Sequence, residues 1–189
     1  MPVPTLVCAS CPLTPKQRQT FETVQRIWLE HVFWTRFFIV SDVGSLPDLS
    51  AVTNRLLRNP TDFADVLRPL YGPDRAVRFE SLLRDHLVIA SKLVNAAKAG
   101  NTATADEERK LWYSNADEIA LFLNNINPNW SKKVWQDLLY DHLNMTENEA
   151  IYQIRGEYEE SVAEFDKIQK EALQMANYMA GGIIKQFKV

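Results

Sequence analysis

The sequence has few cysteines and no long apolar run, and each absence excludes a class of protein. Its two cysteines, Cys8 and Cys11, lie in a proline-rich N-terminal segment, without a second cysteine pair or a nearby histidine to complete a zinc site. A disulfide scaffold is therefore excluded, and we expect reduced thiols in a cytoplasmic protein. Since no stretch approaches the roughly 18 to 20 apolar residues of a membrane span, and no basic segment precedes an apolar one as in a secretion signal, no membrane association is predicted.

Neither sign of charge is in large excess. The chain has 21 Lys and Arg residues against 24 Asp and Glu residues, for a formal net charge of −3. This balance predicts neither nucleic acid nor anionic lipid as a partner. The 189 residues are 46% hydrophobic, a composition typical of a globular domain with its own core. A small-molecule ligand and self-association stay open.

Apolar residues recur at the three-four spacing of helices, and no segment alternates as a strand does. We therefore predict an all-α, up-and-down bundle of the ferritin-like or four-helix type, with kinked helices. Thr14-Pro15 predicts a helix start, Asn59-Pro60 a break, and Thr146-Glu-Asn-Glu149 a restart through a capping box. The predicted domain covers residues 14–182, between a flexible tail at 1–13 and a C-terminal tail at 183–189.

An internal repeat is also predicted. Residues 59–87 align with 115–143 without a gap and with eight identities in 29 positions, including Asn59 with Asn115 and His86 with His142. We interpret the match as a duplication, which would bring corresponding residues of two helix pairs near one another. Because both asparagines lie near helix irregularities, we expect capping roles for them.

The three histidines are the strongest functional signal. His31, His86 and His142 lie 55 and 56 residues apart, and each is preceded by an acid and followed by an aliphatic residue. Each lies in the apolar stripe of a different predicted helix, so the three imidazoles are expected to converge in the core. Neutral nitrogen ligands on rigid elements suit a transition metal.

We therefore predict a mononuclear three-histidine site with an open position for water, holding zinc, iron or nickel and serving hydrolytic or redox chemistry. The residues three before the histidines are Trp28, Leu83 and Leu139, so the Glu-x-x-His pairs of di-iron bundles are lacking. Two alternatives stay open. The histidines are hydrogen-bonded core residues of a metal-free structural, interaction or small-molecule-binding bundle, or they carry out acid-base catalysis.

Two further sets of residues complete the predicted site. The acids before the histidines point to the flanks of their helices, from which Asp85 would orient His142 and Asp141 would orient His86. Together with Glu30 they form the predicted set of carboxylates around the ligands. A pocket for a flat ligand is predicted from aromatic residues, among them Trp34, Trp112 and Tyr158, although aromatics at helical spacing are more often core.

Five stretches of the chain carry a family resemblance. They are Glu30-His-Val-Phe-Trp-Thr-Arg36, Leu82-Leu-Arg-Asp-His86, Leu111-Trp-Tyr-Ser-Asn-Ala-Asp117, Ile126-Asn-Pro-Asn-Trp130 and Gly181-Gly-Ile-Ile-Lys-Gln-Phe187. Together they resemble a family of uncharacterised bacterial all-helical proteins, over nearly the whole chain after about residue 20. The resemblance implies a helical fold and no particular activity. More distantly, histidines from several helices look like those of hemerythrin-like and damage-inducible metal-binding bundles, which place paired ligands one turn apart on a single helix; this chain does not.

Overall fold

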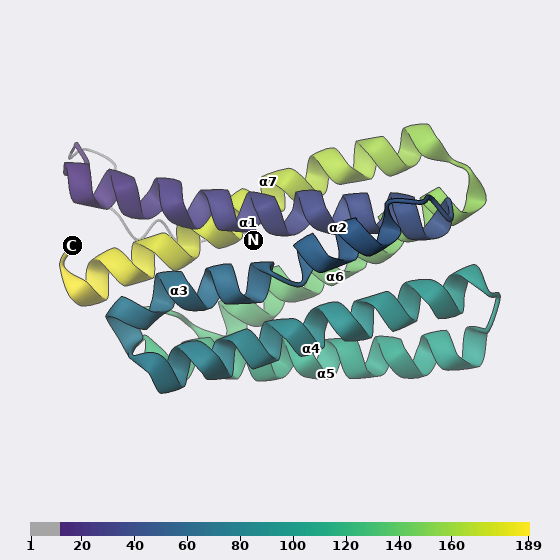
Figure 1. The fold of residues 1–189 in the computed structure, drawn as a ribbon. Coiled ribbons are helices and arrows are strands. Elements are labelled where there is room, and N and C mark those ends of the chain that lie inside the picture. The colour runs from purple at the N-terminus through teal and green to yellow at the C-terminus, as the bar shows by residue number, and fades with distance from the viewer. Residues whose placement is uncertain (1–11) are drawn as a thin grey trace.

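The computed structural model describes residues 12–189, which form seven helices and no strand (Figure 1). The predicted all-α class is confirmed. Cys8 and Cys11 lie outside the described residues. The helices are α1 (Pro15–Val43), α2 (Leu49–Leu56), α3 (Asn59–Tyr71), α4 (Pro73–Lys98), α5 (Thr102–Ile126), α6 (Lys132–Arg155) and α7 (Tyr158–Phe187).

The six longer helices form three antiparallel pairs. Helices α1, α4 and α6 run in one direction, and α3, α5 and α7 return in the other (Figure 1). Each long helix packs against the next one in chain order, and α7 packs back against α1, while the short α2 packs against α1. Helices α1, α4 and α6 also contact one another, so these three parallel helices meet in the interior.

Local sequence signals explain most helix ends. Thr14 caps α1 through a reciprocal bond with Gln17, and Pro15 occupies the first turn, where its missing N–H costs nothing. The predicted break falls between α2 and α3, where Pro60 lies in the first turn of α3. Gly156 ends α6 with a φ of 74°, a left-handed conformation that glycine adopts without a Cβ clash.

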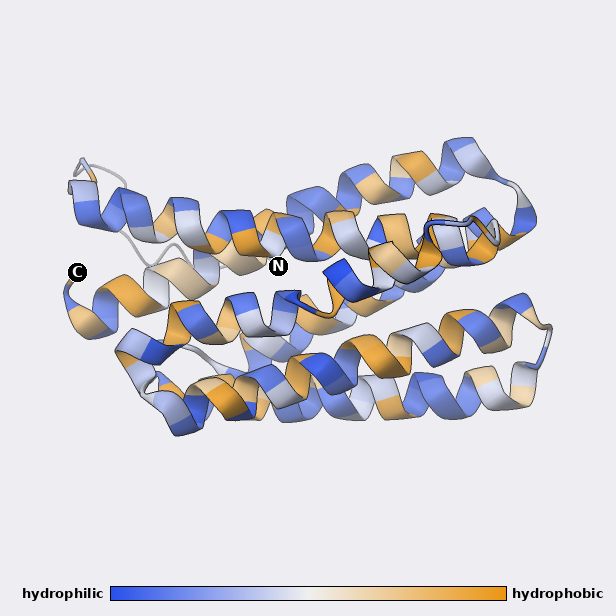
Figure 2. Cartoon of the chain, viewed as in Figure 1, coloured by the Kyte–Doolittle hydropathy of each residue, from blue (hydrophilic) through white to orange (hydrophobic). Residues whose placement is uncertain are grey.

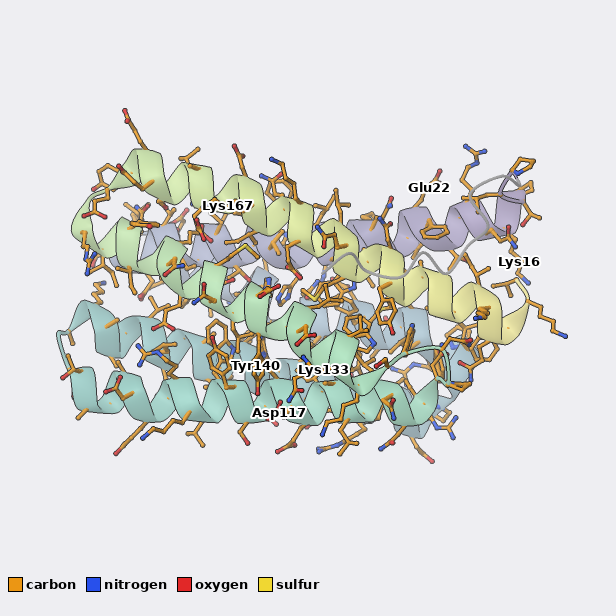
Figure 3. The ribbon with its side chains drawn as sticks, turned by 180° about the vertical axis from the view of Figure 1, so that it is seen from behind. Lys16, Glu22, Asp117, Lys133, Tyr140 and Lys167 are labelled. Carbon is orange, nitrogen blue, oxygen red and sulfur yellow. The ribbon has the colours of Figure 1, made fainter. Side chains whose placement is uncertain are left out.

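Apolar residues line the inward side of each helix, and polar residues cover the outside (Figure 2). The largest cluster of buried side chains includes Trp28, Phe63, Phe79, Trp112 and Trp135. Lys16, Glu22 and Lys167 project outward, whereas Tyr140 and Asp117 lie beside one another between α6 and α5 (Figure 3). There the Tyr140 hydroxyl donates to Asp117 Oδ1 at 2.9 Å. No helix within residues 12–189 is long and apolar enough to cross a membrane.

Two local predictions are wrong. Helix α6 continues through Thr146 to Arg155 instead of restarting at the capping box, because Thr146 is buried one turn beyond His142 on the same face. The predicted tail after Gly182 is helical, since α7 runs to Phe187 and buries Ile183 completely. In both places packing in the core outweighs a local signal.

The end of α7 is held by a close approach to Trp130. A Cβ built on Gly182 would lie 1.9 Å from the indole Nε1 of Trp130, a separation that real atoms never reach. The same Nε1 donates to the carbonyl oxygen of Tyr178 at 3.2 Å. The absence of a side chain at Gly182 therefore lets the Trp130 indole pack against the backbone of α7, and the glycine does not end the helix.

Candidate metal centre

The predicted convergence of the three imidazoles is found. His31 of α1, His86 of α4 and His142 of α6 each offer one ring nitrogen, and these nitrogens all lie within 4.8 Å of one another. Each residue has a relative exposure of 3% or less. The ring centroids of His31 and His86 are 6.4 Å apart, and those of His31 and His142 are 5.7 Å apart. Three parallel helices thus deliver all the histidines of the chain to one interior point.

The Nδ1 atom of each histidine is hydrogen-bonded to a side chain of the next long helix along the chain, which runs antiparallel to the helix of the histidine. Nδ1 of His31 lies 3.0 Å from Asn59 Oδ1 on α3, and Nδ1 of His86 lies 2.9 Å from Asn115 Oδ1 on α5. Nδ1 of His142 lies 3.1 Å from Glu171 Oε2 on α7. Nδ1 is therefore hydrogen-bonded in all three rings, and Nε2 is the second nitrogen of each.

The two amide partners also fix the ring tautomers. Nδ2 of Asn59 donates to the carbonyl oxygen of Ile27, and Nδ2 of Asn115 donates to that of Leu82, both at 3.1 Å. Each carbonyl belongs to the residue four before the histidine. With Nδ2 as donor, Oδ1 of each asparagine is the acceptor, so the histidine Nδ1 carries the proton and Nε2 carries the lone pair.

Glu171 makes the third pair different. Its Oε2 contacts His142, whereas its buried Oε1 has no hydrogen-bond partner among residues 12–189. Burial, reinforced by the nearby Asp141, raises the pKa of Glu171 well above its ordinary value. The centre therefore has two amide–imidazole pairs and one pair with an ionisable partner.

One ring nitrogen of the cluster already accepts a hydrogen bond from a tryptophan. The indole Nε1 of Trp112 on α5 donates to Nε2 of His86 at 3.1 Å. Trp112 is buried, and its ring centroid lies 5.3 Å from that of His86. His86 consequently uses both ring nitrogens in hydrogen bonds, while no hydrogen bond to Nε2 of His31 or His142 is found within residues 12–189.

Burial keeps the imidazoles uncharged. Loss of hydration, reinforced by the neighbouring histidines, lowers the pKa of His31 and of His86 to about 3. Loss of hydration alone lowers the pKa of His142 to about 4. Neutral imidazole is the form that binds a metal ion, so none of the three rings has to lose an imidazolium proton at neutral pH before it binds one.

The acids that precede the histidines do not orient the rings, so that prediction is wrong. Glu30 forms ion pairs with Arg26 at 2.8 Å and with Arg55 at 2.9 Å. Asp85 and Asp141 are exposed. A residue adjacent to an inward histidine points about 100° away from it, and each Nδ1 is hydrogen-bonded to a side chain of the neighbouring antiparallel helix instead.

Of the predicted aromatic pocket, only Trp112 lies at the centre. Trp34 is half-buried, with the guanidinium of Arg55 4.9 Å from its ring centroid. Tyr158, at the start of α7, is 61% exposed. The structure therefore does not bring Trp34 or Tyr158 to the histidines.

The sequence analysis missed Glu171 and assigned Asn59 and Asn115 only to capping. A signal was present, because these three residues are spaced by 56 and 56, as the histidines are by 55 and 56. The aligned segments ended at residue 143, and the third position of the set is a glutamate, Glu171, where the first two are asparagines. Duplication itself stays a prediction, but the equivalent hydrogen bonds occur three times.

Comparison of the chain with protein-family models, curated proteins and solved structures finds no match.

Proposed function

We propose that His31, His86 and His142 bind one divalent transition-metal ion through their Nε2 atoms. The observation that carries the proposal is the combination of three convergent imidazole nitrogens with three Nδ1 atoms that are already hydrogen-bonded to side chains of neighbouring helices. Histidine ligands in metalloproteins commonly donate their other ring N–H to a carbonyl or carboxylate oxygen, which fixes the ring and raises its basicity. Asn59, Asn115 and Glu171 have that role in the proposal.

Binding requires a modest contraction of the cluster. Two nitrogens bonded at about 2.0 to 2.1 Å to a tetrahedral ion lie about 3.4 Å apart, whereas the separations here extend to 4.8 Å. Inward movement of about 1 Å closes the difference and removes the Trp112 hydrogen bond from His86. The incoming cation also favours the ionised form of Glu171, so binding releases a proton and leaves one carboxylate close to the ion.

The ligand set favours a mononuclear centre with an open position. Imidazoles suit zinc, iron and nickel, and Glu171 contacts the Nδ1 atom of one imidazole. A bound ion with three protein ligands polarises water for hydrolysis, and a redox-active ion transfers electrons. Zinc, iron or nickel is thus the proposed cofactor, with hydrolytic or redox chemistry as the proposed activity.

Cobalt(II) tests the proposal, because its visible absorption reports its coordination. Protein without an affinity tag and stripped with a chelator is expected to bind one equivalent of cobalt with the bands of a nitrogen-ligated ion. His142→Gln is expected to abolish these bands. Asp141→Asn, which changes the exposed acid beside this ligand, is the matched control and is expected to retain them. Equal spectra for both variants, or none for the wild type, would overturn the proposal.

The Trp112 bond to His86 favours one alternative, in which the histidines are a metal-free hydrogen-bonded core. In that case the Trp112–His86–Asn115 chain fixes the packing of α4 against α5. The cobalt titration separates the two functions, since a purely structural cluster gives no saturable spectrum.

A further inference from the structure

An apolar cavity lies along the same three helices as the histidines. Its volume is about 70 Å³, and its walls include Trp112, the residue that donates to His86. Six of its lining residues occupy the positions four and eight after each histidine, so the cavity follows the C-terminal side of the cluster. They are Thr35, Ala90 and Thr146 in the first layer, and Ile39, Val94 and Ala150 in the second.

The opposite side of the histidines is filled. Trp28 and Phe63 pack against the His31 ring, with centroids 5.9 and 6.4 Å from it. Leu83 and Leu139, three residues before the other two histidines, are also buried. Side chains of a helix lean toward its N-terminus, so the small residues one turn beyond the histidines leave space on the C-terminal side only. The free side of the cluster therefore faces the cavity.

The lining selects for an uncharged ligand. Most of it is aliphatic, and the one charged pair, Arg109 with Glu147, is internally compensated, with the guanidinium Nε donating to both carboxylate oxygens at 2.8 and 3.0 Å. The Thr146 hydroxyl is buried and has no hydrogen-bond partner among residues 12–189. A buried hydroxyl without a partner is a place for one polar ligand atom.

We propose that this cavity binds a small uncharged molecule of roughly three to five non-hydrogen atoms, with its apolar part against Trp112 and a polar atom at Thr146. The size follows from the volume, which is about half of the ~150 Å³ apolar cavity that holds benzene or xenon in an engineered protein. This ligand is the substrate or effector class for the proposed metal centre, and to that extent the inference rests on the proposed function. The binding itself requires no metal.

Xenon and 1-propanol are suitable probes for the metal-free protein. Xenon is expected to occupy one site, seen by xenon-129 NMR, and 1-propanol is expected to displace it. Ala150→Leu and, independently, the half-buried Ala90→Leu fill the cavity and are expected to abolish xenon binding. Ala103→Leu, exposed on α5, is the matched control and should retain it. If Ala150→Leu does not fold, loss of xenon binding in a folded Ala90→Leu variant is enough to place the xenon site in this cavity.

Thr146→Val tests the polar contact, because valine keeps the shape and removes the hydroxyl. It is expected to weaken 1-propanol binding roughly 2- to 10-fold, the effect of one neutral hydrogen bond, and to leave xenon binding unchanged. No xenon site in the wild type, retention in both filled variants, or unchanged propanol binding would overturn the inference. Xenon binding without cobalt binding would refute the metal centre alone, whereas cobalt binding without a xenon site would refute the cavity proposal alone.

Discussion

The Trp112 indole nitrogen donates to Nε2 of His86 at 3.1 Å, so a core tryptophan holds the lone pair that a metal ion would need. Among the three histidines, His86 alone has both nitrogens engaged in this way within residues 12–189. An ion that binds to all three rings must break this bond, and the indole therefore competes with the metal.

Trp112→Phe removes the competing donor and is expected to tighten metal binding roughly 2- to 10-fold, the net value of a neutral hydrogen bond. The measurement is a competition titration with a chelating indicator. Trp34→Phe is the control, since Trp34 packs near Arg55 and makes no hydrogen bond to a histidine. If Trp112→Phe binds metal with unchanged or lower affinity while the fold is intact, competition by the indole is refuted.

Glu171→Gln gives the third histidine an amide partner like the other two. Metal affinity is expected to fall about 10- to 100-fold, since the amide cannot supply the negative charge that raises the basicity of His142. Stability of the metal-free protein at neutral pH is expected to hold or rise, because burial of an ionisable carboxyl is avoided. Asp166→Asn, at an exposed position on the same helix, is the control and should change neither metal affinity nor stability. An equal loss of metal affinity in both variants would contradict the role of Glu171.

Acid is expected to destabilise the metal-free protein. The histidines have folded pKa values of about 3, 3 and 4, against about 6.5 when unfolded, so the unfolded chain takes up three protons as the pH falls below about 6.5. Glu171 and Glu149 act in the opposite direction above about pH 4.5, because burial raises the pKa of both carboxyl groups, that of Glu149 to about 7. The net proton uptake on unfolding is therefore smaller than three, and it lowers the unfolding free energy as the pH falls.

Denaturant unfolding across pH 4.5 to 6.5 measures this slope. His86→Gln, which keeps a donor and an acceptor but does not titrate there, is expected to reduce it by about one proton. Glu171→Gln is expected to increase it by about one. A slope that His86→Gln leaves unchanged would show that this imidazole is protonated in the folded state.

Asn115→Leu tests the hydrogen bonds between the histidines and the side chains of the neighbouring helices. The change leaves Nδ1 of His86 buried without a partner and removes the second hydrogen bond to the carbonyl oxygen of Leu82, so we expect a loss of about 2 to 5 kcal/mol of unfolding free energy. Asn95→Leu, at an exposed position on α4 where the amide bonds only its own helix, should change stability by less than about 0.5 kcal/mol. Similar effects of the two substitutions in thermal or urea unfolding would contradict the account.

The sequence predicted the helical class and the inward position of the histidines because both follow from apolar spacing along one helix. The break at Pro60 followed from local backbone sterics. Thr146 and Gly182 were wrongly predicted because a capping box and a glycine pair are local signals, and core packing overrides both.

The partners of the histidines required knowledge of which helix lies beside which. Acids adjacent in sequence were the nearest candidates, but the observed partners come from the next helix, 28 or 29 residues along the chain. The repeat of 56 residues links Asn59 to Asn115 and then to Glu171. Only the pairing of the helices shows that these three positions are equivalent.

The most direct test of the central claim is the metal content of the protein, purified without an affinity tag after growth with zinc, iron and nickel supplied in turn. Because the chain has three histidines and all lie in the cluster, elemental analysis reports on this centre. The account predicts close to one ion per chain under at least one supply, and loss of that ion in His86→Gln. Wild-type protein free of stoichiometric metal under every supply, or an undiminished ion in the variant, would contradict it.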